Sequence, residues 1–108
     1  MIGNLRARLT LQEPVRMPDT GGGFVTTFES VAANATVYAE IRQLSGAEQF
    51  RYSQLERNDL FRVILRWRGD VTTDMRLAGD GYLYSILSSC DRDGKKDWLE
   101  ITALRQPA

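Results

Sequence analysis

The stretch FRVILRWR, residues 61–68, is the clearest indicator of the fold of this chain. Its odd-numbered positions are all apolar, whereas three of its four even-numbered positions are arginines. A period of two with one apolar face predicts a β-strand that buries one side in a core. Trp67 is therefore expected in the core, and Arg62, Arg66 and Arg68 are expected to form a charged stripe on the outer face.

Similar alternation before and after this stretch predicts a chain built mostly from strands. Pro14 is expected to end the first strand, because proline donates no hydrogen bond to a neighbouring strand. Asp80-Gly81 is typical of a tight turn between two strands. The expected strands cover residues 5–12, 24–31, 36–43, 61–68, 75–77, 82–90 and 97–105.

One segment breaks the alternation and predicts a helix. Ser45-Gly-Ala-Glu48 is a capping box, in which serine and glutamate side chains satisfy amide groups at the start of a helix. Residues 46–57 contain good helix formers and no proline. Their apolar stripe is thin, which predicts a helix that lies on the surface or packs against a partner.

These elements together indicate a mainly β fold. Six to seven short strands with one short helix in the middle predict a small antiparallel β-barrel. Closure into a barrel also removes the exposed strand edges on which other chains can pair. The chain has 108 residues and a mass of 12.2 kDa, which fits a single domain over residues 1–108.

The charge of the chain is balanced, with 14 basic and 14 acidic residues and a net charge of zero. A protein that grips DNA by bulk electrostatics is usually more basic, so a dedicated DNA-binding domain is disfavoured. All basic residues except Lys95 and Lys96 are arginines. Arginine suits protein interfaces because its planar group pairs with carboxylates. A skewed genome composition would give the same bias.

The residues needed for catalysis are missing from the sequence. It has no histidine, the commonest general base and metal ligand. Its one cysteine, Cys90, is expected to be a small core residue. Acidic pairs such as Asp70 and Asp74 are expected in ordinary surface turns. The acidic cluster Asp91, Asp93, Asp97 and Glu100 faintly resembles a calcium loop, but a plain turn is expected there as well. We therefore expect no enzyme activity, no metal and no cofactor.

The sequence also indicates the cellular compartment in which the protein is expected. No apolar run approaches the roughly 20 residues that a membrane helix needs. A single free thiol fits a reducing, cytosolic setting. We therefore expect a soluble intracellular protein with no membrane partner.

The arginine stripe of residues 62–68 has two open interpretations. It either meets carboxylates of a neighbouring subunit, as we favour, or is simply solvated. A nucleic-acid platform needs aromatic rings and cations on one surface. Strand alternation instead sends Trp67 to the face opposite Arg66 and Arg68, which argues against that use.

The order of the elements resembles one known family. The chain runs through LRARLTLQEP, GGGFVTTFESV, VYAEIRQLSGAEQF, FRVILRWR, VTTDMRL and DGYLYSILSSCDRDGKKDWLEIT. This order resembles the head–tail joining family of long-tailed bacteriophages, also called head-closure or stopper proteins, over residues 5–102. Two departures are a slightly longer stretch at 32–36 and Phe28 in place of the tryptophan expected there.

The resemblance implies a structural protein of the virion neck, made in the host bacterial cytoplasm or encoded by a prophage. Such proteins form a ring, commonly twelve-fold, and are often monomers in isolation. The ring docks on the adaptor ring of the portal, closes the DNA channel and allows tail proteins to attach. Double-stranded DNA passes through it without sequence-specific binding. In the family the segment matching residues 45–58 projects into the channel, so Arg51 and Arg57 are candidate DNA-facing residues.

The candidate subunit interface consists of Arg62, Arg66 and Arg68, which could meet carboxylates of the next subunit. Two alternatives remain open. One is a nucleic-acid-binding barrel similar to an oligonucleotide-binding fold, which salt-dependent DNA binding by the isolated chain would favour. The other is a different ring-forming protein of tail completion.

Overall fold

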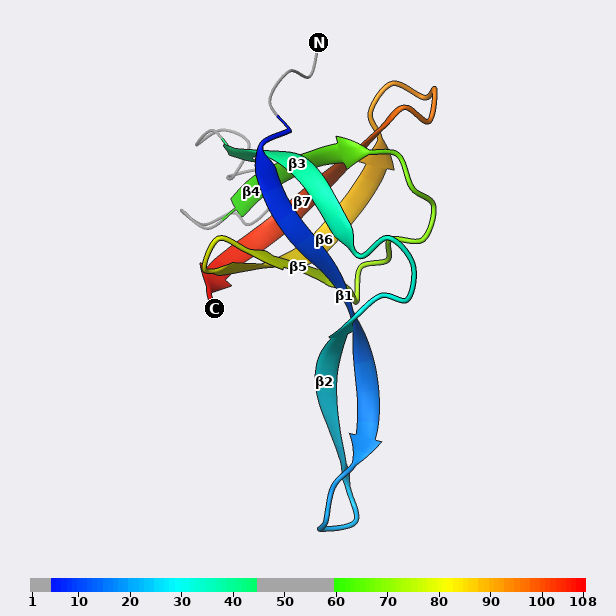
Figure 1. Ribbon diagram of the computed structural model, residues 1–108, viewed down its shortest axis with the longest axis vertical. Helices are drawn as coiled ribbons and strands as arrows, with labels where there is room; N and C mark the ends of the chain where they lie inside the picture. Colours follow the sequence, from blue (N-terminus) through cyan, green and yellow to red (C-terminus); the bar gives the residue numbers. More distant parts are fainter. Residues whose placement is uncertain (1–4, 45–59) are drawn as a thin grey trace.

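The computed structural model describes residues 5–44 and 60–108, and strands make up most of these ranges (Figure 1). Within these ranges the structure contains no helix. There is therefore also no helix there that is long and apolar enough to cross a membrane. The predicted helix over 46–57 lies outside the described residues, as do Arg51 and Arg57. The strands are β1 (Ala7–Pro18), β2 (Phe24–Ser30), β3 (Thr36–Gln43), β4 (Leu60–Arg66), β5 (Arg76–Gly79), β6 (Tyr82–Asp91) and β7 (Trp98–Pro107).

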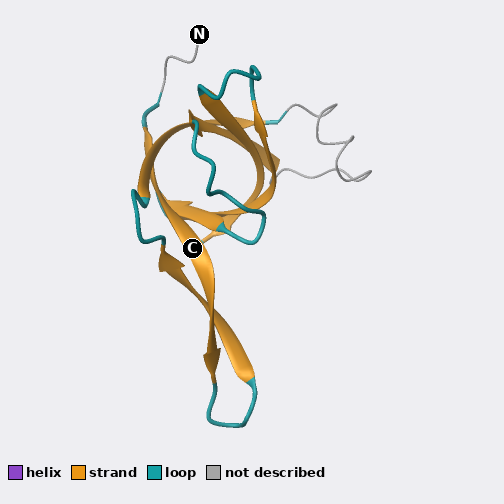
Figure 2. Ribbon diagram, turned by 90° about the vertical axis from the view of Figure 1, so that its right-hand side faces the viewer, coloured by secondary structure: helices purple, strands orange, loops and turns teal. Residues whose placement is uncertain are grey.

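All these strands belong to one antiparallel sheet, with the order β2-β1-β3-β4-β7-β6-β5. The sheet closes because β1 pairs with β3 on one side and with β5 on the other. Six strands therefore form a ring, which Figure 2 shows nearly end-on. The predicted closure of the strands is confirmed. Closure leaves the six ring strands with a neighbour on each side, so their backbone groups are paired over much of their length.

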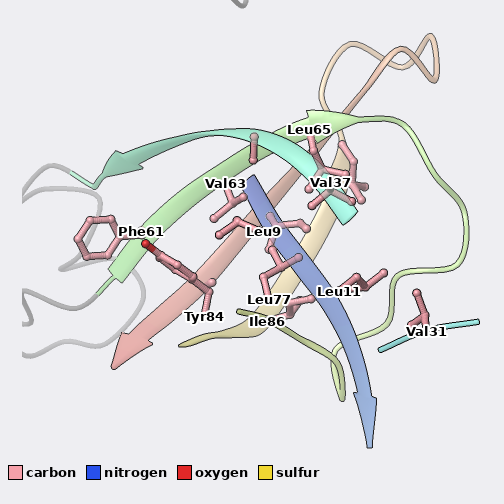
Figure 3. Close-up of a cluster of buried hydrophobic side chains, with 14 residues drawn as sticks. Leu9, Leu11, Val31, Val37, Phe61, Val63, Leu65, Leu77, Tyr84 and Ile86 are labelled. Atoms are coloured by element: carbon pink, nitrogen blue, oxygen red, sulfur yellow. The ribbon is translucent and has the colours of Figure 1, made fainter. Parts of the chain in front are cut away.

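The core fills the inside of this ring (Figure 3). The alternation predicted for residues 61–68 holds for the inner face, since Phe61, Val63 and Leu65 are buried in the core and Trp67 packs against it, but Ile64 on the other face is buried as well. The rings of Phe61 and Tyr84 meet edge to face, with centroids 6.3 Å apart. The other buried core side chains are Leu9, Leu11, Val31, Val37, Ala39, Leu77, Ile86, Leu99, Ile101 and Ala103.

The tight turn predicted between β5 and β6 is confirmed. Asp80 and Gly81 both have positive φ, 53° and 81°. A two-residue turn with two positive φ angles matches the right-handed twist of the strands that it joins. This turn lets the short β5 fold back on β6 and still reach β1.

The prediction that Pro14 ends the first strand is wrong. β1 runs through it to Pro18 and changes partners on the way. Residues 7–12 pair with β3 and β5 inside the ring, whereas residues 13–18 pair only with β2. Beyond the ring each strand has one free edge, and a proline that faces such an edge loses no hydrogen bond.

The prediction that Cys90 belongs to the core is also wrong, because this residue is exposed. The pairing of β6 with β7 shifts between Ile86 and Ser88, where Leu87 is the additional residue. Each added residue moves the following side chains to the other face of a sheet. Cys90 therefore lies opposite Glu100 on the outer face, although it would share the inner face with Ile86 in a regular strand.

Candidate assembly surfaces

The most prominent surface feature is a two-stranded arm that projects from the ring (Figures 1 and 2). We define the arm as residues 13–18 of β1, residues 24–29 of β2 and the connecting tip 19–23. Its strands pair only with each other. An isolated hairpin without a covering layer is of marginal stability in water. The arm is therefore the part of the described chain that depends most on an external partner.

Both faces of the arm carry apolar side chains. On one face Met17 lies opposite Val25, and on the other Pro18 lies opposite Phe24. Phe24 is 61% exposed, and Met17 and Val25 are 47% and 46% exposed. Large apolar side chains that gather on one exposed element mark an interaction site more often than single ones do.

The arm is held at both ends by specific contacts. At the tip, one carboxylate oxygen of Asp19 accepts hydrogen bonds from the amides of Gly21 and Gly23, at 2.8 and 2.9 Å. At the root, the guanidinium of Arg76 lies 4.0 Å from the centre of the Phe28 ring. Its Nε donates a 2.7 Å hydrogen bond to Gln12. These contacts fix the arm as a defined element.

The predicted interface arginine Arg62 is engaged within its own chain. Its Nε lies 3.0 Å from a carboxylate oxygen of Glu100. The second oxygen of Glu100 lies 3.9 Å from Arg92 Nε. Both side chains of the Arg62–Glu100 pair are largely covered, so this pair helps to hold β4 against β7 on the outer face of the ring.

Arg68 is committed to its own chain as well. It forms a two-pronged ion pair with Asp70, through Nε at 2.6 Å and Nη2 at 2.7 Å. It also donates hydrogen bonds to the carbonyl oxygens of Asn34 and Ala33. The hydrogen bond between the two side chains raises the pKa of Arg68 and lowers the pKa of Asp70. Arg68 thus ties the β4–β5 connection to the β2–β3 connection.

Arg66 differs from the other two, because its side chain is exposed and lies over the ring of Trp98, 5.3 Å from the ring centre. Within residues 5–44 and 60–108 it forms no ion pair. The structure therefore does not present the predicted stripe as three equivalent free cations. Among these three predicted arginines, Arg66 is the one available to a neighbour.

A cavity of about 510 Å³ opens beside Arg66, where β3 begins and β4 ends. Its walls come from β3, from the end of β4 and from the loops that follow β2 and β4. Apolar residues dominate the lining, among them Val37, Leu65 and Trp67. Tyr38, which is 56% exposed, contributes an aromatic edge. We call this cavity the outer pocket.

A second cavity, of about 580 Å³, lies at one end of the ring. The guanidinium of Arg105 lies there over two rings, 4.0 Å from the centre of Phe61 and 4.2 Å from that of Tyr82. Burial raises the pKa of the neighbouring Tyr84. Because Arg105 stacks on two aromatic rings of its own chain, it is less available to a partner than Arg66.

The part of the chain that the structure describes contains no group of three or more His, Cys, Asp or Glu side chains able to hold a metal ion. In the acidic stretch 91–97, Asp91 accepts a 2.8 Å hydrogen bond from the amide of Lys96. A side chain that bonds a nearby backbone amide is the usual means of stabilising a turn. This contact supports the prediction of an ordinary turn there.

The sequence predicts a hairpin with a glycine-rich loop at the position of the arm but does not mark the arm as a functional element. The signal was present in the alternation of residues 24–31, where both faces carry large or β-branched side chains. Large apolar side chains on both faces of a strand suit contact with other groups on both sides. In this molecule the strand lies outside the ring, so those side chains are left for a partner.

A closed ring of strands, an exposed apolar arm and an apolar outer pocket define a small β protein built for assembly. The chain belongs to the phage head completion protein family, whose model matches residues 1–106. As a member of this family the protein is a component of the bacteriophage virion, as predicted. None of the curated proteins compared with this chain matches it.

Two solved structures are similar to this one. The solution structure of protein SF1141 from Shigella flexneri 2a has a TM-score of 0.74 at 24% identity, over 95% of this chain and 94% of that chain. A chain from the virion of a native gene transfer agent particle has a TM-score of 0.64 at 21% identity, over 94% of this chain and 93% of that chain. At these identities the likeness shows a shared fold.

Proposed function

We propose that this protein is a structural component of the phage neck, with no enzymatic activity. It forms a ring between the portal with its adaptor and the tail, closes the DNA channel and allows the tail to attach. The observation that carries this proposal is the match of the head completion family to residues 1–106. A small β-barrel with exposed assembly surfaces suits such a role, because the ring of strands provides a rigid body.

The balanced charge of the chain supports a channel function. A subunit with no net charge lets DNA pass, whereas firm contacts to many phosphates would hold it in place. We propose that Arg51 and Arg57, which lie outside the described residues, face the DNA from the segment 45–58. Two arginines per subunit would attract the DNA backbone without binding a particular sequence.

The subunits of the proposed ring, commonly twelve in the family that the sequence resembles, assemble on the adaptor more readily than in solution. Each contact between two subunits is small, so it does not offset the entropy lost when free subunits associate. When subunits dock on the adaptor, their simultaneous contacts with the adaptor offset this loss of entropy. The isolated protein is therefore expected to be a monomer.

The alternative function as a nucleic-acid-binding barrel would have to rely chiefly on Tyr38, which is 56% exposed. Three rings that face outward each have an arginine of the same chain over one face: Arg16 over Phe24, Arg66 over Trp98 and Arg76 over Phe28. Bases stack on open aromatic faces. The second alternative is that the protein is another ring-forming protein, one that completes the tail. It differs from the main proposal only in where the ring lies in the particle.

Electron microscopy of particles made without this protein tests the proposal. Heads that package DNA, then lose it and never gain tails are the expected result. Full heads that keep their DNA and carry tails would overturn the proposed role. Unattached tails with a defect at the end that would join the head, together with heads that keep their DNA, would favour the tail-completion alternative.

A further inference from the structure

The arm leaves several apolar side chains largely exposed. Met17 and Val25 share one of its faces and are each nearly half exposed, and Phe24 at the end of the arm is more exposed still. A two-stranded ribbon has no inner layer of its own to bury such groups. Their exposure in the single chain implies that another molecule covers them in the assembly.

The charges on the arm indicate what kind of molecule covers it. On the face that carries Met17 and Val25, Glu13 lies directly opposite Glu29. Like charges at directly opposite positions destabilise a strand pair. Neither carboxylate forms an ion pair with any residue in the ranges 5–44 and 60–108. The partner surface is therefore apolar and also brings positive charge.

The outer pocket of the same chain has both properties. Its lining is mostly apolar and includes the exposed ring of Tyr38. Arg66 lines the pocket, and Arg8 lies directly opposite Tyr38 on the neighbouring strand β1. Both arginines are exposed, and in the described part of the chain neither forms an ion pair. The pocket is therefore complementary to the arm in polarity and in charge.

We propose that the arm of one subunit binds the outer pocket of the next subunit, a second copy of this chain. Met17 and Val25 enter the pocket, while Glu13 and Glu29 face positive charge at its rim. This inference rests on the proposed function, because it describes how the subunits of the neck ring hold one another. Arm and pocket are different surfaces of one chain, so the contact is head-to-tail and repeats from subunit to subunit until the ring closes.

Disulfide trapping in assembled particles tests this contact. Particles are produced by a phage that lacks this gene and is supplied with a variant carrying Cys90→Ser, Met17→Cys and Tyr38→Cys. After oxidation, the expected result is a ladder of covalent oligomers that extends beyond the dimer on a non-reducing gel. The matched control replaces Met17→Cys by Lys95→Cys, in the exposed turn 91–97, and is expected to give monomers only.

The outcomes separate the contact from the proposed function. If the variant is present in the particles and gives no ladder, the proposed contact is wrong and the neck function stands. If the cysteine on the arm becomes linked to a different virion protein, the arm binds that protein and the proposed contact is again wrong. If the wild-type protein is absent from purified particles, the proposed function fails together with this inference.

Charge reversal decides the question if the cysteine variant does not fold. Glu13→Arg with Glu29→Arg is expected to abolish incorporation into particles. Adding Arg8→Glu and Arg66→Glu to the same chain is expected to restore incorporation, because the signs at the contact are then exchanged. Normal incorporation of the first variant, or failure of the combined variant to assemble although it unfolds cooperatively, would contradict the proposed contact.

Discussion

Gly79 lies so close to Arg8 that a Cβ built on the glycine would stand 2.6 Å from the Arg8 carbonyl oxygen. The same Cβ would stand 2.7 Å from Cδ2 of Leu9, a buried core side chain. This close approach occurs where β5 meets β1 and completes the ring of strands. The ring therefore closes at a position that tolerates no side chain without movement of the backbone.

We predict that Gly79→Ala lowers the free energy of unfolding by about 1–3 kcal/mol, the usual cost of inserting a group into a filled space. Urea unfolding of the purified protein measures the change. Gly69→Ala is the matched control, since a Cβ at Gly69 meets nothing within 4 Å, and it should change stability by less than about 0.5 kcal/mol. Equal stability of the two variants would show that the closure is loosely packed.

Arg68 is predicted to contribute more to stability than its ion-pair partner. Arg68→Ala removes the pair with Asp70 and also leaves the carbonyl oxygens of Ala33 and Asn34 without their donor. We expect a loss of about 1–3 kcal/mol. Asp70→Asn should cost no more than about 1 kcal/mol, because the Asp70 side chain is 54% exposed and solvent screens the pair. Thermal unfolding at neutral pH compares the two variants.

The ion pair also predicts a pH dependence. The hydrogen bond from Arg68 lowers the pKa of Asp70. A carboxyl whose pKa is lower in the folded state adds stability above its unfolded pKa of about 3.9, and this contribution disappears as the pH falls through the folded value. The difference in stability between wild type and Asp70→Asn should therefore be present at pH 7 and shrink below about pH 4. A difference that is constant with pH would contradict this account of the pair.

The predicted interface arginines should separate into two kinds on charge reversal. Arg62→Glu places like charge beside Glu100, 3.0 Å away in the present pair, and is expected to destabilise the chain by about 1–3 kcal/mol. Within residues 5–44 and 60–108, Arg66→Glu removes only a stacking contact with Trp98, worth about 1 kcal/mol at an exposed site. We therefore expect Arg66→Glu to fold and to fail in attaching to heads. Sedimentation of particles with bound variant measures attachment, and normal attachment would exclude Arg66 from the interface.

Arg51 and Arg57 give a prediction about DNA retention. If they face the channel, Arg51→Glu with Arg57→Glu repels the DNA backbone and leaves the ring of strands unchanged. We expect the double variant to join particles normally and to lower the fraction of heads that keep their DNA, measured by nuclease protection. Arg51→Lys with Arg57→Lys is the control and should retain DNA. Equal retention by both variants would show that the two charges do not act on DNA.

Much of the fold could be predicted from the sequence because its strands follow a simple rule. Alternating apolar residues marked the inner face of β4, and Asp80-Gly81 marked the turn before β6. The errors came from features that alternation does not encode. Pro14 is tolerated because β1 has left the ring by that point, and Cys90 faces outward because of one additional residue at Leu87. Both depend on which strands are neighbours, which no local pattern reveals.

The candidate interface was harder to predict, because whether an arginine is free to bind another subunit depends on the ion pairs that it forms within its own chain. Three arginines at alternating positions look equivalent in the sequence. The fold brings Glu100 to Arg62 and Asp70 to Arg68, so that Arg66 is the exposed one. The arm could not be predicted for a similar reason. In the sequence the apolar residues of β2 resemble core residues, and only the order of the strands in the sheet shows that they lie outside the ring.

Electron cryo-microscopy of the neck in complete virions tests the central claim most directly. The account predicts a closed ring of copies of this chain between the adaptor on the portal and the first protein of the tail, with the DNA channel on its axis. Copies found at another position in the particle, or a neck in which no density fits this fold, would contradict it.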